Sequence, residues 1–138
     1  MAKMKRYEEL ETDDGRVIRY QRHDNGGGLV ARGARVDVTA YVADSAWVDP
    51  GAVVRPGASV GRFCWVESGA VVEDGARLGS HVHVGRDAVV GRSARLGARC
   101  DVGAGARLDR GLVVEPEARI VEGAHVERHG FPPHVLAA

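Results

Sequence analysis

The chain has 138 residues, and its 19 basic and 19 acidic side chains cancel to a formal net charge of zero at pH 7. A chain of this length builds one hydrophobic core, and a balanced charge gives no bulk attraction for nucleic acid or for an anionic membrane. No segment approaches the length of a membrane-spanning helix, and residues 1–7 lack the apolar core of a secretion signal, so we expect a cytoplasmic protein.

Residues 1–29 precede the regular part of the chain, and we expect them to form a cap. The run from Arg6 to Arg22 predicts two short strands around Asp13-Asp14-Gly15, which is a β-hairpin pattern. Such a hairpin covers a backbone edge that would otherwise pair with another chain. The glycines of Asn25-Gly26-Gly27-Gly28 predict a flexible joint into the next domain.

Residues 30–127 form one long array with a period of six. Every sixth residue from Val30 to Val126 is Val, Leu or Ile, and the residue two places before each of these is small or apolar, usually Ala. Six is the period neither of an α-helix nor of a simple amphipathic strand. The two apolar positions share one side of an extended strand, and Gly, Asp, Ser and Pro between them favour turns. The array therefore predicts a β-solenoid of short strands and corners.

Hexads such as Leu78-Gly79-Ser80-His81-Val82-His83 resemble those of the bacterial hexapeptide-repeat proteins. The resemblance covers about 100 of the 138 residues. It implies an all-β fold, a left-handed parallel β-helix with three hexads in each 18-residue coil, or about five coils here. It also implies a parallel homotrimer. Periodicity alone would not give the handedness, because parallel crossovers are normally right-handed.

Two cysteines occupy inward positions of the array. Cys64 and Cys100 are 36 residues apart, which places them in one column two coils apart. Because neighbouring strands lie about 4.8 Å apart, their Cα atoms should be about 9.6 Å apart, too far for a disulfide. We expect reduced thiols in the core.

The outward residue before each core aliphatic forms columns with an 18-residue spacing. One column begins with Trp47, Trp65 and His83, and a second contains Val53, Val71 and Val89. Exposed apolar columns favour an interface between subunits. The alternative is that Trp47, Trp65 and His83 stack against a small planar ligand, such as a nucleobase or the adenine of coenzyme A.

The histidines test for catalysis. Enzymes of the resembled family are acyltransferases with a histidine general base, or carbonic anhydrases with a metal held by three histidines. Their histidines usually fall one or two residues after the core aliphatic, whereas His81 and His83 fall three and five residues after Leu78. These two are the candidates if the chain is an enzyme, and no third histidine is in register with them. The sequence predicts no metal site.

Two further features weigh against an enzyme. The array has no inserted loop to cover a substrate, and residues 128–138 predict a short tail, in which Phe131-Pro132-Pro133 should block further strand pairing, rather than a helix. We therefore expect a trimeric, non-catalytic scaffold or a module that binds a ligand or protein partner, without a cofactor. The alternative is a minimal acyltransferase using acetyl-CoA or another coenzyme A thioester, and less favoured is a metalloenzyme resembling γ-carbonic anhydrase.

Overall fold

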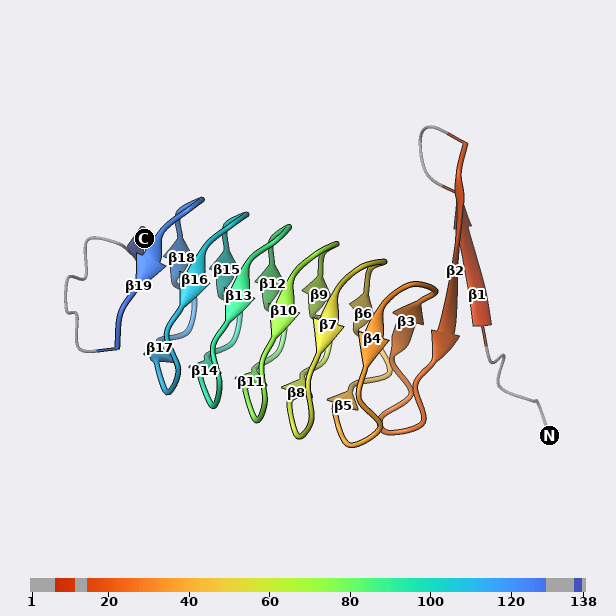
Figure 1. Cartoon of the computed structure of the whole chain (residues 1–138), viewed down its shortest axis with the longest axis horizontal. Helices are drawn as coiled ribbons and strands as arrows, with labels where there is room; N and C mark the ends of the chain where they lie inside the picture. Colours follow the sequence, from red (N-terminus) through yellow and green to blue (C-terminus); the bar gives the residue numbers. More distant parts are fainter. Residues whose placement is uncertain (1–6, 12–14, 129–135, 138) are drawn as a thin grey trace.

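The computed structural model describes residues 7–11, 15–128 and 136–137, and this part of the chain is all-β (Figure 1). Short strands follow one another every six residues and wind into a solenoid of about five coils. Its strands are β3 (Leu29–Ala31), β4 (Arg35–Val36), β5 (Tyr41–Val42), β6 (Trp47–Val48), β7 (Val53–Val54), β8 (Ser59–Val60), β9 (Trp65–Val66), β10 (Val71–Val72), β11 (Arg77–Leu78), β12 (His83–Val84), β13 (Val89–Val90), β14 (Arg95–Leu96), β15 (Asp101–Val102), β16 (Arg107–Leu108), β17 (Val113–Val114), β18 (Arg119–Ile120) and β19 (His125–Val126).

The strands of successive coils pair in parallel and form three sheets along the solenoid. The first sheet contains β3-β6-β9-β12-β15-β18, the second β4-β7-β10-β13-β16-β19, and the third β5-β8-β11-β14-β17. Paired residues are 18 apart, as in Val53↔Val71 and Val71↔Val89. The predicted solenoid with coils of 18 residues is therefore confirmed.

The core is the double row of apolar residues that the six-residue period predicts. From Ala40 to Cys100 the small residue and the aliphatic residue of every hexad are buried, with at most 4% of each exposed. Cys64 and Cys100 are buried free cysteines, and each Sγ donates to a backbone carbonyl of the next coil, that of Gly79 at 2.9 Å and that of Glu115 at 3.1 Å. Burial raises the pKa of both thiols, that of Cys64 to about 11.

The corners depend on one backbone position, three residues after the core aliphatic. There the φ angle is positive in almost every hexad, at glycines such as Gly75 (φ 68°) but also at six other residues. Two of these are aromatic, Phe63 and His81, both with a φ of 58°. Residues with a side chain rarely adopt this region, so these corners hold strain that packing with their neighbours offsets.

The N-terminal hairpin covers the first coil. Strand β1 (Tyr7–Glu11) pairs antiparallel with β2 (Val17–Arg22), and β2 pairs antiparallel with β3. The prediction of a flexible joint at residues 25–28 was wrong: the backbone of Asn25 and Gly28 hydrogen-bonds to Val42 of β5 at 3.0 and 2.9 Å. A Cβ atom on Gly28 would meet Val42, so the glycines permit this close approach instead of providing flexibility.

The last coil is also paired. Strand β20 (Leu136–Ala137) lies antiparallel to β18, so the prediction that residues 131–133 block further strand pairing was wrong. A proline removes only its own N–H, and the chain resumes pairing three residues later. Residues 131–133 themselves lie outside the described residues. Within the described part, no helix has the length and hydropathy needed to cross a lipid bilayer.

Candidate functional site

The outward face of the first sheet carries a histidine between two carboxylates. His83 lies on β12, and its Nδ1 is 2.8 Å from Oδ1 of Asp101, its direct neighbour on β15. Its Nε2 is 2.5 Å from Oε2 of Glu67, the residue that follows β9 in the previous coil. The three side chains are 22–43% exposed, so the cluster is open to solvent at the surface of the sheet.

The two contacts constrain the protonation of the ring. A carboxylate only accepts hydrogen bonds, and a neutral imidazole has a single N–H. Both contacts of His83 are therefore satisfied at once only when the ring carries two protons and a positive charge. To accept a proton from another group, the ring must first release one of these two protons, and the carboxylate at that nitrogen must move away. Asp101 can turn from His83 toward a second cation, because Nη2 of Arg119 lies 3.9 Å from its Oδ2.

Aromatic rings line the same face, as the sequence predicts. Trp65 of β9 lies next to His83, with ring centroids 4.8 Å apart and planes inclined by 32°. Trp47 of β6 continues the row at 6.1 Å and 38°. Trp65 therefore has a ring neighbour on each side within the row.

Asp49, the residue after β6, connects the row of aromatic rings to the N-terminal cap. Its Oδ2 accepts a hydrogen bond from Nε1 of Trp65 at 2.8 Å, and its Oδ1 accepts one from the hydroxyl of Tyr20, on β2, at 2.9 Å. Tyr20 is only 5% exposed, and burial together with Asp49 raises the pKa of its hydroxyl. The cap, the tryptophan and the histidine are therefore connected by direct contacts.

The structure separates the other predicted site residues from His83. His81 lies at the corner before β12, where its ring stacks on Phe63 with centroids 4.9 Å apart. Val53, Val71 and Val89 form the predicted column on the second sheet, but they are half-buried rather than exposed. The apolar side chains that are most exposed include Phe63 (56%) and Val113 (71%), which the sequence pattern did not single out.

Glu67 and Asp49 were also missed, although the sequence carries a signal for them. Trp65–Asp49, His83–Glu67 and His125–Asp109 all join a ring nitrogen to a carboxylate 16 residues earlier. In an 18-residue coil, this spacing is the diagonal neighbour in the previous coil. Within the described residues, no group of three or more His, Cys, Asp or Glu side chains is arranged to hold a metal ion. Glu67 and Asp101 contact different ring nitrogens and do not converge on a common point.

Comparisons with known proteins give the fold. No protein-family model and no curated protein sequence matches the chain. A mutant perosamine N-acetyltransferase from Caulobacter crescentus, in complex with CoA and GDP-perosamine, is 21% identical with a TM-score of 0.54, over 67% of this chain and 49% of that one. A second mutant complex of that enzyme is 16% identical with a TM-score of 0.50 over the same shares. The acetyltransferase domain of PglB from Neisseria gonorrhoeae, with acetyl coenzyme A, is 20% identical with a TM-score of 0.45, over 70% and 55%.

The six-residue repeat and the three parallel sheets define the class of this chain. It has the left-handed β-helix fold of the hexapeptide-repeat proteins, and structures of this fold include N-acetyltransferases. The chain spans about half the length of the perosamine N-acetyltransferase structures, since the match covers 49% of each of those chains.

Proposed function

We propose that this chain is an acyltransferase that uses a coenzyme A thioester and that His83 is its general base. The observation that carries the proposal is the placement of His83 between Glu67 and Asp101 on an open face of the solenoid. A histidine oriented by a carboxylate is a common general base. The shared fold supports the same reaction class, since the perosamine N-acetyltransferase structures contain CoA.

We assign different roles to the two carboxylates. Glu67 makes the shorter contact and is the less exposed of the two, at 22% against 43% for Asp101. It is the carboxylate that orients the ring. When Asp101 turns toward Arg119, Nδ1 gives up its proton to solvent, and this nitrogen of the neutral ring then accepts the proton of the incoming substrate.

The proposed reaction transfers an acyl group to an amine or a hydroxyl. The acceptor attacks the thioester carbonyl and gives its proton to Nδ1 of His83. The tetrahedral intermediate then collapses, the carbon–sulfur bond breaks, and the coenzyme A thiolate leaves and takes the proton from the imidazolium. Glu67 stabilises the positive ring between these two steps.

A non-catalytic binding module is the second candidate, and it was the function favoured by the sequence. The uninterrupted array from Val30 to Val126 supports it, because a bare solenoid face offers no wall against water. The two candidate functions differ in what they require around the face that carries His83. Catalysis requires a second surface over His83, and we propose that a neighbouring copy in a homotrimer supplies it.

Binding and turnover, measured separately, test the proposal. Coenzyme A and acetyl-CoA are titrated by calorimetry, and thiol release is then followed with a panel of amine and sugar acceptors. We expect acceptor-dependent release that His83→Gln lowers by about 100- to 10,000-fold, the usual contribution of a general base. The matched control is His81→Gln, because His81 lies two residues away and stacks on Phe63 instead of contacting a carboxylate.

Three outcomes separate the candidates. Acceptor-dependent release that survives in His83→Gln would remove His83 from the chemistry. Binding of coenzyme A without release would favour the binding module, with Trp47 and Trp65 as its contact surface. The absence of both coenzyme A binding and thiol release would favour a scaffold.

A further inference from the structure

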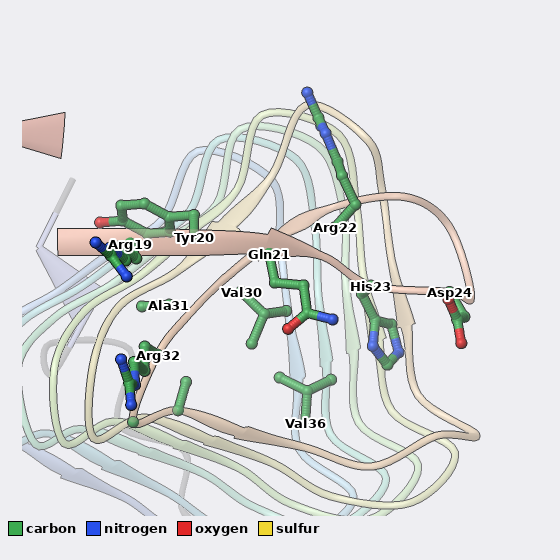
Figure 2. Close-up of a pocket in the computed structure, with 12 residues that line it drawn as sticks. Arg19, Tyr20, Gln21, Arg22, His23, Asp24, Val30, Ala31, Arg32 and Val36 are labelled. Atoms are coloured by element: carbon green, nitrogen blue, oxygen red, sulfur yellow. The ribbon is translucent and has the colours of Figure 1, made fainter. Parts of the chain in front are cut away.

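The cap leaves a cavity at the N-terminal mouth of the solenoid. Strand β2 crosses the mouth, and a cavity of about 650 Å³ lies between it and the first coil (Figure 2). This volume is within the range of cavities that hold small molecules, about 300 to 1,000 Å³. Side chains from β2, β3, β4 and the turns that follow β2 and β3 line it.

The floor of the cavity is the uncovered end of the core. Val30, Ala34 and Val36 occupy the same inward positions as the residues that are fully buried in later coils, yet each of them is only partly buried. Among the described residues, no further coil lies beneath them. Apolar side chains that every other coil covers are therefore available to an alkyl group, which would gain about 0.8 kcal/mol for each CH₂ that it buries.

The rim of the cavity is cationic. Three arginines line it, Arg19, Arg22 and Arg32, with Asp24 as the one acidic residue among the described lining residues. Nη1 of Arg22 donates to the carbonyls of Gly27 and Asp44. Arg19 and Arg32 are exposed to solvent. Gln21 extends from β2 toward Val30 and Val36, which adds an amide at the boundary of the two zones (Figure 2). The chain as a whole has no net charge, so the positive charge at the mouth is a local excess.

We propose that the mouth binds an amphipathic anion, a medium-chain alkyl carboxylate, with its chain on Val30 and Val36 and its head at Arg32. Guanidinium groups bind carboxylates through paired, charge-assisted hydrogen bonds. The site is separate from the proposed acyl-transfer site, because β12 lies three coils along the first sheet from β3, about 14 Å at the strand spacing of 4.8 Å. The inference therefore goes beyond the proposed function.

Calorimetry with sodium decanoate at submillimolar concentration tests the site, with sodium butyrate and 1-decanol as the comparison ligands. We expect decanoate to bind at least about tenfold more tightly than butyrate, because butyrate offers too few methylenes to the apolar floor. Decanol should also bind at least about tenfold more weakly than decanoate, since it lacks the charged partner of the arginines. Arg32→Glu should weaken decanoate binding by at least about tenfold.

Two control variants establish whether decanoate binds at the mouth or elsewhere on the chain. Arg92→Glu, a charge reversal at an exposed corner of a later coil, and His83→Gln should both leave decanoate binding unchanged. Equal affinities for decanol and decanoate, or an unchanged affinity in Arg32→Glu, would overturn the proposal. So would a light-scattering mass showing end-to-end pairs of the chain that Arg32→Glu dissociates, because a second copy would then be the occupant of the mouth.

Discussion

Asp49 holds two side chains from different parts of the chain, because its two carboxylate oxygens accept from Tyr20 and from Trp65. Asp49→Asn leaves one acceptor oxygen and turns an NH₂ group toward a donor. We expect this variant to lose about 2 kcal/mol of stability, whereas Tyr20→Phe, which removes one hydrogen bond to a charged group, should lose about 1.5 kcal/mol.

Urea unfolding followed by tryptophan fluorescence measures both effects. The native emission spectrum should change in Asp49→Asn, because Trp65 loses its partner, and stay near wild type in Tyr20→Phe. Asp74→Asn is the control. The side chain of Asp74 is 47% exposed and lies 4.0 Å from Arg55, so the loss of its charge should cost only a few tenths of a kcal/mol. Equal stability in all three variants would contradict the structural role of Asp49.

The Cys64 thiol should make the free energy of unfolding depend on pH in the alkaline range. Its pKa is raised from 9.0 to about 11, chiefly by burial, so the folded state keeps a proton that the unfolded state has already lost. Unfolding then becomes more favourable as the pH rises from about 9 to about 11. We expect Cys64→Ala to lose less stability than the wild type across this window, measured by urea unfolding at several pH values. The two curves would run parallel if the thiol did not contribute.

At the scale of the element, glycines occupy two positions of the hexad, and these positions have different physical requirements. Gly75 has a φ of +68°, and a Cβ there would meet only Ser93 at an ordinary distance of 3.5 Å. Gly91 does not have a positive φ, but a Cβ there would collide with backbone atoms of Leu108 and Asp109 in the next coil. One glycine provides a backbone conformation, and the other provides space.

We expect Gly75→Ala to destabilise the protein by about 1 to 2 kcal/mol, the cost of placing a side chain in the left-handed region. Gly91→Ala should cost more, since two backbones must separate and a solenoid coil contacts only its neighbours. Thermal unfolding of the two variants checks the order. Ser93→Gly, at a corner with a φ of 59°, should be neutral to slightly stabilising. A larger loss in Gly75→Ala than in Gly91→Ala would contradict this distinction.

At the scale of the whole molecule, the slender solenoid cannot bury all its large apolar side chains. Trp47, Trp65 and Phe63 remain 36–56% exposed, and aromatic side chains are enriched in protein interfaces. The half-buried column of Val53, Val71 and Val89 gives the second sheet an apolar centre. These surfaces favour the homotrimer.

We expect light scattering of the dilute protein to give the mass of a trimer, and Val71→Asp to dissociate it, because a carboxylate buried between subunits costs several kcal/mol. Val113→Asp is the matched control: Val113 is 71% exposed on the third sheet and outside the column, so this variant should remain a trimer. A monomer mass for the wild-type protein would contradict the interface and leave the exposed tryptophans to another partner.

The sequence by itself determined which residues face inward and which share a column, because a period of six leaves one register for every strand. Trp47, Trp65 and His83 therefore fall in line as predicted, and Cys64 and Cys100 lie in the core. The cap hairpin was also predictable from its turn residues. Each of these features depends on local spacing and on the alternation of side chains along a strand.

Only the tertiary structure decided which neighbour each outward side chain contacts. The column of His83 contains Trp65 and Asp101, but the choice of Glu67 for Nε2 depends on side-chain torsions across a diagonal between coils. The packing of residues 25–28 against β5, the contact of Tyr20 with Asp49 and the pairing of β20 with β18 join segments outside the repeat. The six-residue repeat cannot specify these contacts, because each of them involves a segment that lies outside the repeat.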